Sequence, residues 1–254
     1  MGKTLYLECA SGISGDMVVA SLLDLGADER HLREALASLP LAGYEVVVSE
    51  VAKNGVRARD FDVRLQAELE NHDHDMAWLY GHLEGDAAPT HAHEHENGCN
   101  LPHEHGDNHS HHHAHEGEHS HEGAHHHHEH RGLADVLAII DAGTLTQRAR
   151  RAARRVFEVL AQAEAQAHGT TPEKVHFHEV GAVDSIIDIV SAAVCLDALD
   201  IDEVVVPFLC EGSGTVRCAH GILPVPVPAV CATVAQHGIA LHVLPVQGEL
   251  VTPT

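Results

Sequence analysis

The sequence predicts a mixed α+β domain, in which one sheet is flanked by helices and a histidine-rich insertion interrupts the chain. Asn54-Gly55 joins two runs rich in β-branched residues, 44–52 and 56–65, and this pattern is typical of a β-hairpin. Apolar residues with helical spacing recur on both sides of the insertion, as in 16–25 and 145–168. Strands and helices are therefore expected together in one domain.

The chain before the hairpin contains one predicted strand and two predicted helices. A strand at 4–9 leads through a loop of small residues into the helix at 16–25. Ser14 is the expected N-cap of this helix, and Gly26 is expected to end it. An amphipathic helix at 28–39 follows and is ended by a proline.

After the insertion, a short helix at 133–140 precedes the long helix at 145–168, for which Gly169 is the expected C-cap. The remaining elements follow from apolar spacing and β-branched content. In chain order, they are a helix at 182–199, a strand at 204–209, a helix at 229–236 and a strand at 239–246.

The composition limits the possible functions. The formal net charge of −23 argues against nucleic-acid binding, which needs a basic surface, and is compatible with the collection of cations. Aromatic residues make up only 3% of the chain, so the core is expected to consist of Val, Leu, Ile and Ala. The six cysteines form no C-x-x-C pair, no stretch is apolar enough to span a bilayer, and no signal peptide is evident. We expect a cytoplasmic homo-oligomer with reduced thiols.

Residues 71–130 separate the first part of the domain, 1–70, from the second, 131–254. They include 20 of the 27 histidines, 12 acidic residues and no lysine or arginine. Because such a segment buries too little apolar surface to offset its ordering entropy, we expect it to be disordered. Its imidazoles and carboxylates predict the buffering of nickel, copper, zinc or cobalt. The run is too long and irregular for a purification tag; a pH-responsive polyelectrolyte is the alternative.

The stretch that follows the long helix gathers ionisable side chains around a glycine. His176 and His178 are two residues apart, so both rings leave the same side of an extended segment. Asp184 and Asp188 are four residues apart and share a face of the next helix. The four side chains could converge on zinc, nickel, cobalt or manganese. The alternative is a histidine that caps a strand beside a solvated aspartate face.

Three further features could bind a ligand. In the loop before the first helix, Gly12, Ser14, Gly15 and Asp16 could cradle an anion with free amides, although tight turns explain the glycines equally well. Glu164 and His168 share a helix face and could reach a metal or simply pair with each other. A second glycine loop is expected at 211–215. Basic residues also crowd the hairpin and the start of the long helix, where they could meet a phosphate or solvent: Lys53, Arg57, Arg59, Arg64, Arg148, Arg150, Arg151, Arg154 and Arg155.

Five blocks of the sequence resemble, in order along the chain, the LarC family of nickel-insertion proteins. The third block begins with the highly specific motif His-Phe-His-Glu, and a histidine-rich insertion is similar to members of this family. The blocks are Gly12–Met17, Ala163–Gly169, His176–Ser185, His220–Pro226 and Glu249–Thr254.

The resemblance implies that Ni²⁺ is inserted into pyridinium-3,5-bisthiocarboxylic acid mononucleotide, where two sulfurs and one ring carbon bind it. CTP would be consumed, assisted by Mn²⁺ or Mg²⁺, and the product would be the nickel-pincer nucleotide that serves lactate racemase. Formation of a carbon–nickel bond requires a base for the ring proton.

The resemblance assigns the reaction, and we assign roles to the residues as hypotheses. The base would be His176, His178 or Glu179, beside Asp184 in the catalytic site. Weakly held nickel ligands would be His176, His178, Asp184 and Asp188, together with the Glu164–His168 pair. The nucleotide would be held by Gly12, Ser14, Gly15, Asp16, Gly212, Ser213, Gly214 and His220.

Two departures from the family matter. Glu8 stands where the family has Asp. The family also continues past Thr252-Pro253-Thr254 into a region that binds CTP, so activity is expected to need that region or a partner polypeptide. A nickel chaperone or storage protein without catalysis, and a metal-dependent hydrolase, are the alternative functions.

Overall fold

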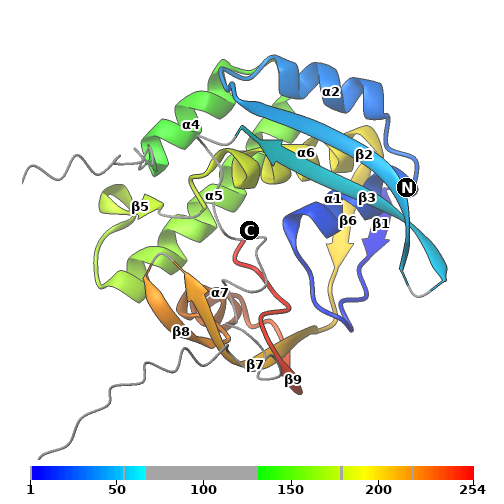
Figure 1. Cartoon of the computed structure of the whole chain (residues 1–254). Helices are drawn as coiled ribbons and strands as arrows, with labels where there is room; N and C mark the ends of the chain where they lie inside the picture. The colour runs from blue at the N-terminus through cyan, green and yellow to red at the C-terminus, as the bar shows by residue number, and fades with distance from the viewer. Residues whose placement is uncertain (1, 54, 67–130, 178–179, 219) are drawn as a thin grey trace, which may run out of the picture. The chain divides into compact units, whose positions relative to one another are not determined.

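The computed structural model describes five stretches of the chain, which are residues 2–53, 55–66, 131–177, 180–218 and 220–254 (Figure 1). All of them belong to one unit, formed by Met1–Gly81 and His128–Thr254. The predicted insertion, its disorder and its metal binding lie outside the described residues, as do His178 and Glu179.

The first strand, β1 (Lys3–Tyr6), pairs in parallel with β6 (Ile201–Val205), far along the chain. Helix α1 (Gly15–Asp24) follows the loop after β1 and packs against α6 (Val183–Ala198). Ser14 holds the predicted N-cap position of α1, without a side-chain hydrogen bond to the helix backbone. The strand, loop and helix expected at the start of the chain are confirmed.

The predicted hairpin is also confirmed (Figure 1). Strands β2 (Tyr44–Lys53) and β3 (Val56–Leu65) pair antiparallel along their whole length. Helix α2 (Glu29–Ala37) precedes them, and the Asp28 carboxylate caps it by accepting two backbone amides of its first turn at 2.9 and 3.3 Å. Because β3 contacts both α1 and α6, the hairpin brings its side chains to those two helices.

The long helix α5 (Gln147–His168) begins and ends where its sequence predicts. The Thr146 hydroxyl accepts the amide of Ala149 at 3.1 Å, and Gly169 adopts a left-handed φ of 63° as C-cap. Helix α4 (Leu133–Ala142) packs against α5. Three short elements flank this pair in the chain: β4 (Arg131–Gly132) before α4, and the 3₁₀ helix η1 (Pro172–Lys174) and β5 (His176–Phe177) after α5. Strands β4 and β5 pair antiparallel.

The last part of the chain forms a three-stranded mixed sheet. Its central strand, β7 (Leu209–Cys218), pairs antiparallel with β8 (Gly221–Val225) and parallel with β9 (Leu241–Gln247). Helix α7 (Pro228–His237) joins β8 to β9 and packs against α5. The helix and last strand expected in this region are confirmed.

Two predictions in this region were wrong. The glycine loop expected at 211–215 lies inside β7. A Cβ atom on Gly212 would lie 1.9 Å from the carbonyl oxygen of Gly248, so the glycine serves a close contact between two backbones. The strand expected at 204–209 is divided between β6 and β7, and Pro207, which has no amide to donate, lies between them.

The α+β class is confirmed, and the core consists mainly of Val, Leu, Ile and Ala, as expected. One apolar cluster joins the helices α1, α2, α4, α5 and α6 to the hairpin, and a second lies around β7. Instead of one sheet, the described strands form three two-stranded sheets and one three-stranded sheet. None of the helices in the described stretches is long and apolar enough to cross a membrane.

Replacement of Phe157 by alanine should strongly destabilise the protein. Phe157 lies on α5, is 0% exposed and packs against Phe177, with 6.1 Å between ring centroids. Since the truncation would leave a cavity in the main core, we expect the free energy of unfolding to fall by about 3–5 kcal/mol. Urea denaturation followed by far-ultraviolet circular dichroism measures the change. The control is Val156→Ala, at a side chain that is 40% exposed, and equal midpoints for the two variants would contradict the assigned packing.

Candidate functional site

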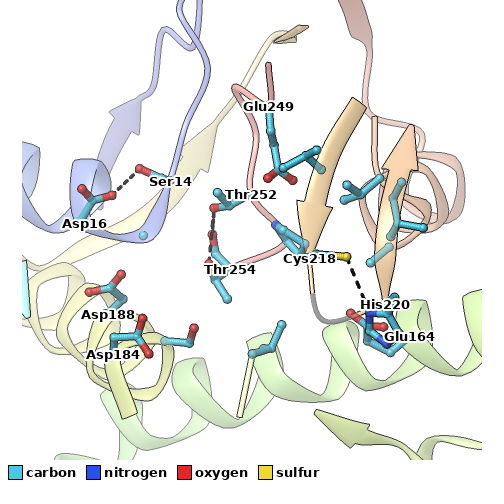
Figure 2. Close-up of a pocket in the computed structure, with 18 of the residues that line it drawn as sticks. Ser14, Asp16, Glu164, Asp184, Asp188, Cys218, His220, Glu249, Thr252 and Thr254 are labelled. Carbon is cyan, nitrogen blue, oxygen red and sulfur yellow. Dashed lines mark hydrogen bonds between the residues drawn. The ribbon is translucent and has the colours of Figure 1, made fainter. Parts of the chain in front are cut away.

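A cavity of about 570 Å³ is lined by residues of α1, β3, α5, α6, β7, β8 and α7, by His220 between β7 and β8, and by residues after β9. Figure 2 shows part of this lining. Every one of the five sequence blocks that resemble the nickel-insertion family contributes to its lining. Block by block, the lining residues are Ser14, Gly15 and Asp16; Glu164, Ala167 and His168; Val180, Asp184 and Ser185; His220 and Leu223; and Glu249, Thr252, Pro253 and Thr254.

Carboxylates occupy one side of the cavity. Asp184 and Asp188 lie one turn apart on α6, and Asp16 comes from the first turn of α1, where it accepts a hydrogen bond from the Ser14 hydroxyl (Figure 2). Asp62 reaches the same cavity from β3. Asp184 and Asp188 each have one buried carboxylate oxygen without a hydrogen-bond partner among the described residues. Oxygen atoms of this kind are suited to binding a cation.

Asp188 lies at the centre of this carboxylate cluster. Burial, together with the nearby charges of Asp16, Asp184 and Asp62, raises the pKa of Asp188 to about 8. Gly15 allows the close approach of the two helices, since a Cβ atom there would lie 2.8 Å from the Asp188 side chain. Near neutral pH the Asp188 carboxyl is therefore largely protonated, and a bound cation would favour its ionised form.

The opposite side of the cavity carries a thiol and imidazoles (Figure 2). The Cys218 sulfur lies 3.9 Å from Nδ1 of His220, and the rings of His220 and His168 have centroids 4.8 Å apart. His168 Nε2 in turn lies 3.5 Å from Oε2 of Glu164 on the same helix. Sulfur and imidazole donors suit nickel, and an imidazole beside a carboxylate can also accept a proton.

The residues after β9 form a further wall of the cavity. The Thr252 hydroxyl donates to the Thr254 carbonyl oxygen at 3.0 Å. Gly12 is not among the lining residues. It is in close contact with the segment after β9, since a Cβ atom on Gly12 would lie 2.0 Å from the Leu250 carbonyl oxygen. The Gly12 amide is not free, as it donates to the Cys9 carbonyl oxygen at 3.2 Å. A tight backbone contact therefore accounts for Gly12, as the alternative interpretation of the loop held.

The lining is strongly acidic. Arg217, an exposed residue of β7, is the one lysine or arginine among the described residues that line the cavity. None of the arginines that the sequence singled out lines the cavity; Arg64, for example, pairs with Asp62 at 2.9 Å, and Arg148 pairs with aspartates near β6. Seven of the described lining residues are acidic: Asp16, Asp60, Asp62, Glu164, Asp184, Asp188 and Glu249. This charge favours a cation.

The cavity brings together many, but not all, of the residues that the sequence suggested. His176 is exposed and lies outside the lining, so it does not join Asp184 and Asp188. Among the described residues, no three His, Cys, Asp or Glu side chains are close enough together to hold a metal ion. Gly212, Ser213 and Gly214 lie in β7 and also outside the lining. Predicted residues that do line it are Ser14, Gly15, Asp16, Glu164, His168, Asp184, Asp188 and His220.

Sequence reasoning gave no role to five ionisable residues of the lining: Asp60, Asp62, Arg217, Cys218 and Glu249. Asp62 lies in a stretch whose pattern indicated only a hairpin strand, and Arg217 and Cys218 belong to none of the recognised motifs. The alternation of Asp60 and Asp62 along β3 was the available signal, because residues two apart share a strand face. Glu249 was part of a family block, but we assigned it no role.

The raised pKa of Asp188 predicts a pH-dependent stability. Between pH 3.8, the ordinary pKa of aspartate, and about 8, the folded protein holds a proton that the unfolded chain has released. The free energy of unfolding contributed by this group therefore falls as the pH rises through that window. We expect Asp188→Asn to be more stable than wild type at pH 8 and the two to converge near pH 4. Urea denaturation in the presence of a chelator measures this, with exposed Asp24→Asn as the control; parallel pH profiles for wild type and Asp188→Asn would contradict it.

Comparison with known proteins identifies close similarities. A relative from Alkaliphilus metalliredigens, named pyridinium-3,5-bisthiocarboxylic acid mononucleotide nickel insertion protein, is 44% identical over 254 residues, which are 100% of this chain and 51% of the relative. Relatives of the same name from Clostridium acetobutylicum and Acetivibrio thermocellus are 40% and 34% identical; each match covers 99% of this chain, and 54% and 50% of the relatives. The chain spans about half the length of these curated relatives.

No solved structure was found to match the chain. A family model described as nickel insertion protein matches residues 5–254, which is almost the whole sequence. The family resemblance that rested on five short blocks is thus confirmed over the full domain. The chain belongs to the family of nickel insertion proteins.

Proposed function

We propose that the cavity is the place where nickel enters pyridinium-3,5-bisthiocarboxylic acid mononucleotide, the compound in the relatives' names. The observation that carries this proposal is the convergence of all five family blocks on one cavity. The blocks are distributed from Gly12 to Thr254, so that only the fold brings them together. A cavity of about 570 Å³ is also in the range of small-molecule sites.

In this proposal, Asp184 and Asp188 receive Ni²⁺ as cargo, with Asp16 and Asp62 adding negative charge. Their buried, unpartnered oxygens support the assignment. Carboxylates hold nickel less tightly than thiolate sulfur does, so the ion can pass from the protein to the two sulfurs of the substrate. The positive pyridinium ring would be attracted by the same acidic lining.

The imidazole side of the cavity would accept the ring proton. As the carbon–hydrogen bond breaks, its electron pair forms the carbon–nickel bond and the proton passes to a base. His220 is the base that we favour, next to Cys218 at 3.9 Å and to the His168 ring. This assignment replaces His176, which is exposed and outside the cavity. Glu164, 3.5 Å from His168, would orient and stabilise the protonated pair.

Arg217 would bind the substrate phosphate, since no other lysine or arginine lines the cavity in the described stretches. CTP consumption with Mn²⁺ or Mg²⁺, a partner polypeptide that supplies it, and the use of the product by lactate racemase are further parts of the proposal. They are supported by the family resemblance alone.

Loss of the nickel-receiving carboxylate should reduce nickel insertion. With Asp188→Asn, we expect product formation to fall on the order of 10- to 100-fold at limiting nickel, because one anionic ligand is lost. Part of the activity should return as nickel is raised. The assay mixes the chain with nickel, the mononucleotide, CTP, Mg²⁺ and the C-terminal half of a relative, and follows product absorbance. Asp24→Asn is the control, and wild-type rates for Asp188→Asn at limiting nickel would refute the role of Asp188.

Loss of the proposed base should instead give a defect that nickel cannot repair. With His220→Ala, we expect the insertion rate to fall about 100-fold. Added imidazole should restore part of the rate by entering the vacated space. His237→Ala, at an exposed histidine that ends α7, is the matched control. A His220→Ala rate equal to that of the control would exclude His220 as the base, and nickel binding without any product from wild type would favour a chaperone.

A further inference from the structure

Glu211 is a buried carboxylate that the proposed chemistry does not use. It lies on β7, is 0% exposed, and is the one charged residue that is fully buried in the described part of the chain. Burial of a carboxylate in an apolar cluster is unfavourable unless hydrogen bonds compensate for the lost hydration. The partners of Glu211 therefore indicate why an acidic side chain stands there.

Those partners are backbone amides. Oε1 of Glu211 accepts hydrogen bonds from the amides of Gly212 at 2.7 Å, Leu250 at 2.6 Å and Val251 at 3.2 Å. Two of the three donors belong to the segment Glu249–Thr254, which is distant in sequence from β7. One carboxylate oxygen thus holds this segment against the central strand of the sheet.

The other edge of the segment is held by the loop before α1. The Ile13 amide donates to the Leu250 carbonyl oxygen at 2.8 Å, and the Thr252 amide donates to the Ile13 carbonyl oxygen at 3.2 Å. Gly12 and Gly212 allow these close approaches, since a Cβ atom on either would lie about 2 Å from a backbone oxygen of residues 248–250. The segment therefore lies between β7 and the loop before α1 and is in close backbone contact with both.

The same segment forms a wall of the cavity. Val251 is 4% exposed and packs into the apolar cluster around β7, whereas Glu249 and Thr252–Thr254 line the cavity. Glu211 itself is absent from the lining. Any influence of its carboxylate on a ligand must accordingly pass through the backbone that it holds.

We propose that Glu211 is a positioning residue: its buried carboxylate fixes Glu249–Thr254 as the wall against which the mononucleotide binds. The proposal rests on the function proposed above for the cavity. An apolar side chain of similar length would fill the space in the cluster, but it would leave the amides of Leu250 and Val251 without their acceptor. The hydroxyls of Thr252 and Thr254 would then lose their fixed position.

Two substitutions at Glu211 test this role. Glu211→Met keeps the length and removes the acceptor, whereas Glu211→Gln keeps one accepting oxygen. For Glu211→Met we expect amide hydrogen exchange at Leu250 and Val251 to rise about tenfold or more, with exchange in α5 unchanged. The dissociation constant of the mononucleotide, measured by calorimetry without nickel, should rise about tenfold. Glu211→Gln should restore both quantities to within about threefold of wild type.

A second variant displaces the segment without altering the carboxylate. In Gly212→Ala, the new Cβ atom would collide with the Gly248 carbonyl oxygen at 1.9 Å. For Gly212→Ala we expect the same rise in amide hydrogen exchange at Leu250 and Val251 and the same rise in the dissociation constant of the mononucleotide. This variant tests the proposal independently of whether Glu211→Met folds. Gly132→Ala is the matched control, because its Cβ atom would meet its nearest neighbour at an ordinary 3.4 Å, and Gly132 lies outside the cavity lining.

The outcomes separate the two proposals. Faster exchange in the segment, together with unchanged mononucleotide binding, would overturn the positioning role alone. Unchanged exchange in both Glu211→Met and Gly212→Ala would also overturn it. If the unaltered chain, with the C-terminal half of a relative present, binds no mononucleotide, the function proposed for the cavity fails and the positioning role fails with it.

Discussion

The contact between Gly15 and Asp188 determines how closely α1 and α6 approach, and the cavity depends on it. A side chain larger than hydrogen at position 15 would collide with the aspartate. Both helices bury apolar faces in the same cluster, so the favourable burial of residues such as Leu22 and Ile187 holds them together. That packing compensates for the repulsion between the carboxylates at their ends.

This arrangement links stability to function. A set of like charges around a buried carboxyl is unfavourable for the fold, and proteins tolerate such groups chiefly where binding or catalysis needs them. A divalent cation would relieve the repulsion and release the proton of Asp188. In the proposed site, nickel uptake would therefore be coupled to proton release from Asp188, while the imidazoles on the opposite side would remain available for the ring proton.

Elements with strong local signals were predictable from the sequence. The hairpin followed from Asn54-Gly55, and the ends of α5 followed from Thr146 and Gly169, because each signal acts within a few residues of the element it controls. Asp184 and Asp188 were assigned to one helix face for the same reason. The glycine run in β7 was misinterpreted because its partner, Gly248, is distant in sequence. The amides that bind Glu211 could not be predicted either, because Leu250 and Val251 are also distant in sequence. The two-residue spacing of His176 and His178 predicted a shared side of the strand, but it could not show that His176 would be exposed.

The pairing of β1 with β6 has a consequence for how the protein is made. Lys3 pairs opposite Ile201, Cys9 bridges to Leu209, and Ile13 bridges to Val251. Residues 3–13 must therefore wait for residues 201–251, which are synthesised much later, before they acquire these native partners. Contacts of such long sequence separation slow folding, and they leave the first strand open to mispairing during synthesis.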